Sequence, residues 1–192
     1  MRLLFGYVFA FLIAAAAGLG TTWLAMTRGV AFGSVKIGTW TAWPKTGTSD
    51  VDPYARAVIA HTGELPTGSG DGVAFVARTD DRGRPLDGRC DVALRGITPA
   101  ARFWTLTLYD PSGQLVENSA DRYGFTSQEV VRKANGNFEM AVSPRARPGN
   151  WLPTGGAERY VLILRLYDTP VGVATPSSRE ATMPSIITEA CP

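Results

Sequence analysis

The hydrophobic pattern of the chain begins with an unbroken apolar run. Residues 3–26 carry no charged side chain, with Arg2 before them and Arg28 just after. At 1.5 Å per residue, a helix of this length reaches about 36 Å, enough to cross a hydrocarbon core roughly 30 Å thick. The pattern therefore predicts an N-terminal transmembrane helix within residues 1–28.

The same segment also fits a secretory signal peptide. Ala15 and Ala17 flank a small residue in the pattern of a cleavage site. The apolar run continues past this point, however, and Trp23 suits the aromatic belt at a membrane surface. We favour a retained signal-anchor with its N-terminus inside, which predicts a single-pass protein of the inner membrane whose C-terminal domain is periplasmic. Cleavage stays open as the alternative.

A polar stretch and one short helix follow the apolar run. Residues 29–51 are rich in Gly, Thr and Ser and carry two tryptophans, so we expect a linker with a docking segment. Asp52 is a good N-cap, Pro53 suits the first helical position, and Gly63 stands where a C′ glycine belongs. Apolar residues recur at helical spacing between these signals. The pattern predicts a helix from Pro53 to about residue 62.

From residue 72 onward, short apolar stretches alternate with turn residues. Residues 73–78 and 89–95 are predicted to form a hairpin. Residues 103–109 alternate well, with Trp104, Leu106 and Leu108 on one side, and the turn at 110–113 is expected to return the chain as a partner strand at 115–118.

The C-terminal half repeats this pattern. Asn135 and Gly136 predict a hairpin between residues 130–134 and 138–142. Further strands are predicted at 159–167 and 185–191. Short strands at near-regular spacing predict a mainly β domain, a β-sandwich or jelly roll with one short helix, over residues 52–192.

The net charge of the chain bears on whether it binds nucleic acid. The chain has 19 Lys and Arg against 17 Asp and Glu, and two of the arginines, Arg2 and Arg28, flank the apolar run. The remainder is therefore formally neutral and lacks the basic footprint of a nucleic-acid-binding protein. We expect no nucleic-acid partner and a membrane association through the N-terminal helix.

The two cysteines, Cys90 and Cys191, lie about a hundred residues apart and have no metal-ligand spacing. An oxidising compartment would favour a disulfide between them. A loop of that length contributes roughly 4–5 kcal/mol in the chain-entropy model. The alternative is two unrelated buried thiols.

Catalytic signatures are sparse. His61 is the only histidine and lies in the last turn of the predicted helix, where it favours the helix C-terminus. A single histidine is too few for the usual zinc or iron site, and a Ser-His-Asp set would have to use His61 at this helix end, with no elbow motif around any serine. We expect no metal or cofactor. The enzymatic alternative is a carbohydrate- or lipid-active hydrolase that uses two paired carboxylates. Its candidate acids are Asp110, Glu117, Asp121 and Asp168.

A polar and aromatic set interrupts the apolar strands. Arg165 shares a strand face with Val161, Ile163 and Tyr167, and an unpaired buried guanidinium would cost several kcal/mol. We therefore predict a cleft that holds a small-molecule or glycan ligand, sugar-like or carboxylate-bearing, by stacking and forked hydrogen bonds. The alternative is a structural network that fixes the loops. The candidate residues are Tyr109, Asn118, Arg122, Tyr123, Asn150, Trp151, Arg165 and Tyr167.

Several of these residues lie in stretches with a family resemblance. Residues 101–110, 150–156 and 161–170, together with 66–70, resemble the bacterial Domain of Unknown Function 1214 family in its short, membrane-anchored form. The resemblance implies a β-sandwich that often follows a second domain, of the 1254 group, in longer proteins. It implies no activity or catalytic residues.

These observations favour an exported binding or envelope-associated module over an enzyme. A separate 1254-type protein is a further candidate partner, with this chain as its structural counterpart.

Overall fold

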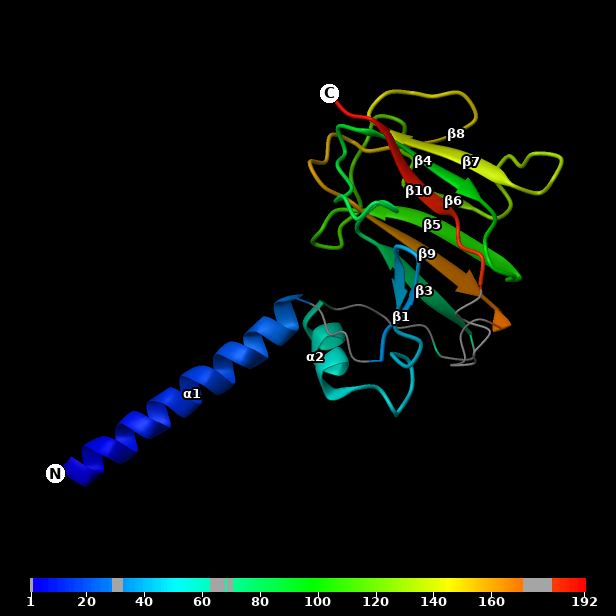
Figure 1. The fold of residues 1–192 in the computed structure, drawn as a ribbon. Coiled ribbons are helices and arrows are strands. Elements are labelled where there is room, and N and C mark those ends of the chain that lie inside the picture. The colour runs from blue at the N-terminus through cyan, green and yellow to red at the C-terminus, as the bar shows by residue number, and fades with distance from the viewer. Residues whose placement is uncertain (1, 29–32, 63–67, 69–70, 171–180) are drawn as a thin grey trace.

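The computed structural model describes residues 2–28, 33–62, 68, 71–170 and 181–192 (Figure 1). Its helices and strands follow in this order: α1 Arg2–Arg28, β1 Val35–Ile37, β2 Trp40–Ala42, α2 Pro53–Thr62, β3 Gly72–Ala77, β4 Asp91–Gly96, β5 Phe103–Tyr109, β6 Gly124–Thr126, β7 Phe138–Ser143, β8 Asn150–Pro153, β9 Val161–Tyr167 and β10 Ser185–Ala190.

The strands form two sheets. The six-stranded sheet has the order β1-β2-β3-β9-β5-β6, and the four-stranded sheet has the order β10-β4-β7-β8. Neighbouring strands are antiparallel, except that β7 and β8 run parallel. Both sheets contribute to one hydrophobic core. The prediction of a β-sandwich is confirmed.

The core is built from the inward-facing half of each strand. In β5, Trp104, Leu106 and Leu108 are buried, whereas the residues between them are half-buried. From the other sheet, β7 contributes Met140 and Val142. Each large apolar side chain that is fully buried contributes about 1.5–3 kcal/mol. The alternation that predicted the strands is therefore also what joins the two layers.

The N-terminal helix α1 extends away from the sandwich (Figure 1). Its window from Arg2 to Ala25 is long and apolar enough to cross a membrane, and none of that window is buried. The whole helix has 27 residues and spans about 40 Å. The predicted apolar helix is confirmed, and its insertion in a membrane stays a prediction.

Two strands occur where a linker was expected. β1 and β2, at Val35–Ile37 and Trp40–Ala42, form a hairpin that pairs with β3 and extends the six-stranded sheet. The indole of Trp40 is buried, and its Nε1 donates to the carbonyl oxygen of Pro184 at 2.8 Å. The linker assignment of residues 29–51 is therefore wrong for 35–42. The sheet begins before residue 52 because Trp40 and Ala42 bury their side chains in its core.

The short helix α2 is confirmed, together with its N-cap. The Asp52 Oδ1 accepts the backbone N–H groups of Tyr54 at 2.9 Å and Ala55 at 3.3 Å. This satisfies donors that the first helical turn leaves without partners. Gly63, predicted to end the helix, lies outside the described residues.

The hairpin predicted from residues 73–78 and 89–95 is wrong. β3 lies in the six-stranded sheet beside β9, and β4 lies in the four-stranded sheet between β10 and β7. The turn at Asp80 does form, but only Thr79 and Pro85 pair across it. Leu86 then enters the core as the chain crosses between the layers. Turn residues predict that the chain reverses, not which sheet it joins.

Two other predicted strands are reduced to single bridges. Residues 115–118 do not form the partner of β5, because only Leu115 bridges to Tyr109 and the neighbouring strand is β6. Residues 130–134 likewise pair with β7 only at Arg132 and Phe138, across the predicted Asn-Gly turn.

The cysteines are joined. Cys90 and Cys191 form a disulfide that closes a sequence separation of 101 residues, with their Cα atoms 4.2 Å apart. Cys90 is buried beside the start of β4, and Cys191 directly follows β10. The bridge thus fastens the C-terminal strand to its neighbour, and the disulfide prediction is confirmed.

Candidate functional site

Arg165 lies near the middle of the outer face of the six-stranded sheet. On β9 it alternates with Leu164 and Leu166, which are buried in the core. In register it stands beside Ala74 of β3 and Thr105 of β5. The side chain is therefore half-buried, on a face that turns away from the hydrophobic core.

The guanidinium of Arg165 contacts Tyr109. Its Nη1 donates to the Tyr109 hydroxyl at 3.2 Å, and its central carbon lies 5.5 Å from the ring centroid, within the range of a cation–π contact. In the described part of the chain, no carboxylate lies within 4 Å of this guanidinium. A half-buried arginine that has a phenol but no acid as its partner retains donors for an anion.

Threonines and aromatic rings surround this pair on the same face. Thr105 pairs with Arg165, and Thr107 pairs with Ile163. Neither threonine hydroxyl forms a hydrogen bond to any residue that the structure describes. At the other end of the strands, the rings of Phe103 and Tyr167 lie 5.8 Å apart. The face therefore presents a cation, free hydroxyls and aromatic edges.

Sequence reasoning omitted Phe103, Thr105 and Thr107 from the candidate residues. They lie on the same face of β5 as Tyr109, three, two and one alternations earlier, respectively. The period-2 pattern of this strand was a sufficient signal. We define the outer-face site as Phe103, Thr105, Thr107, Tyr109, Arg165 and Tyr167.

A second group of candidate residues lies elsewhere. Trp151 pairs with Ala141, between two core residues of β7, and so belongs to the outer face of the four-stranded sheet. Its Nε1 donates to the carbonyl oxygen of Ser143 at 3.0 Å. Arg122 donates to the Trp151 carbonyl oxygen at 3.0 Å and lies over the ring of Phe125. The structure thus brings Arg122 to Trp151 and leaves both away from the Arg165 face.

Two further candidates, Asn118 and Tyr123, have local roles. The Asn118 side chain accepts from the N–H groups of Ala120 and Arg122 and donates to the carbonyl oxygens of Val116 and Arg122, which closes a tight loop. Asp121 hydrogen-bonds the hydroxyl of Tyr123 and so raises the pKa of this phenol.

Asn150 is buried. It donates to the carbonyl oxygens of Val131 and Glu139 and accepts the N–H of Val131. This side chain satisfies backbone groups beside β7 and leaves no polar atom for a ligand.

The acids proposed for hydrolysis belong largely to turns. The Asp110 carboxylate accepts hydrogen bonds from the hydroxyl and N–H of Ser112 and from the N–H of Gln114, and the Ser112 hydroxyl leads in lowering the pKa of Asp110. Asp168 lies 3.9 Å from Arg102 on the surface. Within the described residues, no group of three or more His, Cys, Asp or Glu side chains is placed to hold a metal ion.

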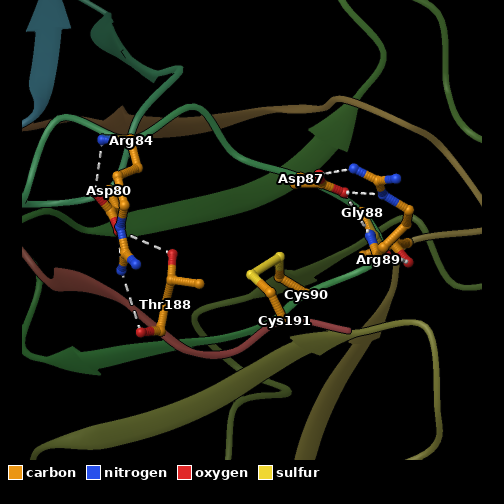
Figure 2. Close-up of a disulfide and its surroundings, with 9 residues drawn as sticks. Asp80, Arg84, Asp87, Gly88, Arg89, Cys90, Thr188 and Cys191 are labelled. Atoms are coloured by element: carbon orange, nitrogen blue, oxygen red, sulfur yellow. Dashed lines mark hydrogen bonds and ion pairs between the residues drawn. A yellow bond between two sulfur atoms is a disulfide. The ribbon is translucent and has the colours of Figure 1, made fainter.

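The surroundings of the disulfide form a separate polar cluster, which Figure 2 shows. Asp80 is almost fully buried and accepts from Thr188 at 2.8 Å and from the Arg84 guanidinium, as well as from two backbone N–H groups. Burial acts to raise the pKa of Asp80, but the hydrogen bonds from Arg84 and Thr188 outweigh it and hold that pKa below its usual value. The cluster ties β10 to the turn after β3.

On the other side of the bridge, Asp87 pairs with Arg89 (Figure 2). The hydrogen bonds from the Arg89 side chain and backbone lower the pKa of Asp87 to about 2. Nearby, the hydroxyl of Tyr160 is buried without a hydrogen-bond partner among the described residues, and burial raises its pKa. These groups support the fold and are not exposed together as a site.

Two sheets that share one core and consist mostly of antiparallel strands define a mainly β domain of the sandwich class, which follows a long apolar helix. Within that class, the chain belongs to the family described as a protein of unknown function, DUF1214, whose model matches residues 71–171. The match covers β3 to β9 and so contains the outer-face site.

The solved structures that are similar to this one include two bacterial proteins. The VPA0106 protein from Vibrio parahaemolyticus matches with a TM-score of 0.59 and 20% identity, over 73% of this chain and 36% of that protein. A putative uncharacterized protein from Burkholderia cenocepacia matches with a TM-score of 0.40 and 15% identity, over 92% of this chain and 52% of that one. This chain thus spans little more than a third of the VPA0106 protein, and the likeness concerns the fold alone. No curated protein matches this chain.

Proposed function

We propose that this protein is a single-pass membrane protein whose sandwich is exported and binds a carboxylate-bearing small molecule or glycan at the outer-face site. The observation that carries the proposal is Arg165, a half-buried guanidinium with a tyrosine hydroxyl as its polar partner. An arginine fork matches the two oxygens of a carboxylate. Free threonine hydroxyls and aromatic rings beside it suit the rest of a sugar-like ligand.

The location rests on two features. The apolar window of α1 has the length of a membrane span and buries none of its residues against the sandwich. The disulfide is typical of a domain on the oxidising side of a membrane. Together they support an anchor in the inner membrane with the sandwich in the periplasm.

The test measures binding of uronic-acid oligosaccharides by calorimetry to the full chain in detergent, beside neutral oligosaccharides of the same length. Arg165→Gln removes the guanidinium and should weaken uronate binding by roughly 10- to 100-fold, the equivalent of a charge-assisted hydrogen-bond pair. Tyr109→Phe should weaken it less, because the phenol positions the guanidinium and does not neutralise the ligand.

The matched control is Arg145→Gln, which removes the same charge from an exposed loop after β7. It should leave uronate binding unchanged. Neutral oligosaccharides that bind as tightly as uronates, or an Arg165→Gln protein that binds like the wild type, would contradict the proposal. A folded variant is verified by its thermal unfolding.

A further inference from the structure

A pocket of about 400 Å³ lies between the end of β2 and the first turn of α2. Residues of the connecting segment line it, among them Trp43, Lys45 and Asp50. The volume is in the range of pockets that hold small ligands. None of the outer-face residues contributes to this pocket, so it is a separate site.

Three charged residues line the pocket: Lys45, Asp50 and Asp52. The Asp52 carboxylate caps α2, whereas Lys45 and Asp50 are exposed, and neither of these two lies within 4 Å of an oppositely charged group in the described part of the chain. A pocket with a separate cation and anion is complementary to a ligand that carries both charges. The ligand's anion would lie at Lys45 and its cation at Asp50.

Other groups of the pocket select the kind of zwitterion. The N-terminal N–H groups of α2 are already bound by Asp52, so Lys45 is the principal partner for an anion there. Trp43 also lines the pocket, and an indole ring attracts an ammonium group. A phosphate ester with a primary amine offers both halves, because its ammonium donates to a carboxylate and its phosphate accepts from an ammonium side chain.

The place of the pocket indicates where such a ligand comes from. The first residue of the lining is Gly33, and α1 ends five residues earlier, at Arg28. Five residues of chain span at most about 18 Å, so Gly33 lies within that distance of the helix end. α2 lies at the C-terminal end of α1 (Figure 1). With α1 in a membrane, the pocket therefore lies near the headgroup layer.

We infer that this pocket binds the phosphoethanolamine group, with Lys45 at the phosphate and Asp50 at the ammonium. The shared chemistry occurs in a phosphatidylethanolamine headgroup and in soluble phosphoethanolamine esters. The lipid source rests on the proposed anchoring of α1, whereas the soluble source does not.

The experiment has two arms, both on the full chain. In detergent, calorimetry compares glycerophosphoethanolamine with glycerol 3-phosphate, which lacks the amine. In phosphatidylcholine nanodiscs that contain either phosphatidylethanolamine or phosphatidylglycerol, native mass spectrometry counts the lipid that stays on the extracted protein. The variants are Lys45→Gln and Asp50→Asn. The matched controls are Lys36→Gln and Asp168→Asn, which remove the same charges from exposed residues outside the pocket.

We expect the amine-bearing ester to bind at least about tenfold tighter than glycerol 3-phosphate, and Asp50→Asn to remove that preference. Lys45→Gln should weaken the binding of both esters, because both carry the phosphate, and the control variants should change neither the affinity nor the preference. Retention of phosphatidylethanolamine identifies the lipid as the source, and binding in detergent alone identifies a soluble ester. Equal binding of the two soluble esters, a preference that survives Asp50→Asn, or no binding in either arm overturns the inference. Arg165→Gln should leave both arms unchanged, so a failure here is distinct from a failure at the outer-face site.

Discussion

The carboxylate of Asp80 and the hydroxyl of Thr188 form a hydrogen bond of 2.8 Å across 108 positions of sequence. This contact joins the turn after β3 to the edge strand β10. The neighbouring Asp81 adds to it, because its carboxylate accepts the N–H of Ile186 and its own N–H donates to the Ile186 carbonyl oxygen. The C-terminal strand is thus held to both layers by side chains as well as by its sheet pairing.

Replacing Asp80 should destabilise the sandwich. Asp80→Asn keeps the shape but replaces an acceptor with an amide that cannot accept from both Arg84 and Thr188. We expect a loss of about 3 kcal/mol, the range for a buried hydrogen-bonded charge, and of about 1 kcal/mol for Thr188→Val. Urea denaturation measures both. Asp168→Asn on the surface is the control and should change the free energy of unfolding by less than about 0.5 kcal/mol.

The disulfide should stabilise the protein mainly by lowering the conformational entropy of the unfolded chain. Removing it by Cys90→Ala with Cys191→Ala frees a loop of about a hundred residues, which the chain-entropy model values at roughly 4–5 kcal/mol. Unfolding of the wild type in the presence of a reductant should shift by the same amount, and that of the double variant should not shift. Two reactive thiols in the unreduced wild type would contradict the bridge.

Acid should destabilise the protein between pH 4 and pH 2, because several carboxyl groups have a lower pKa in the folded state. The pKa of Asp87 falls from 3.8 to about 2 through its hydrogen bonds with Arg89. Lys133 and then Arg95 lower the pKa of Glu139. The unfolded chain therefore binds more protons in this range, so the stability present above about pH 4 is lost as pH falls through about 2.

Burial raises the pKa of Asp81 and works in the opposite direction. Urea midpoints measured from pH 7 to pH 2 test the balance, and Asp87→Asn should flatten the slope below pH 4. A midpoint that stays constant or rises on acidification would show that Asp81 dominates.

Tyr160→Phe should leave the protein as stable as the wild type or more stable by up to about 1 kcal/mol, because the hydroxyl that it removes is buried without a partner among the described residues. Thermal unfolding compares it with Tyr54→Phe, which alters an exposed tyrosine. A loss above about 1 kcal/mol would reveal a hydrogen bond to the Tyr160 hydroxyl.

The first residue of the protein in cells distinguishes a retained membrane anchor from a cleaved signal peptide. Sequencing of the protein from cell membranes should begin at Met1 or Arg2, because the apolar run extends well past its small-residue segment. A start at Gly18 would mean that the segment is cleaved and that the sandwich is released as a soluble exported domain.

The outer-face site was only partly accessible from sequence. Alternation placed Tyr109 on the polar face of its strand and Arg165 on one strand face with Tyr167, and the alternating burial of β5 and β9 agrees with this. The sequence could not separate Arg165 from Trp151, because both stand in apolar stretches with similar composition. Register assigns them to opposite outer faces of the sandwich, since β9 and β8 belong to different sheets.

Local physics by itself determined much of this protein. The apolar N-terminal helix, the Asp52 cap of α2, the alternation of β5 and the pairing of the two cysteines all follow from neighbouring side chains or from cysteine chemistry. The tertiary structure alone decided the strand partners: β3 and β4 separate into different sheets, and β1 and β2 join the larger one. The reason is that period-2 alternation specifies which face of a strand is buried. Which strand lies beside it depends on contacts between residues far apart in the sequence, such as the hydrogen bond from the buried Trp40 indole to the carbonyl oxygen of Pro184.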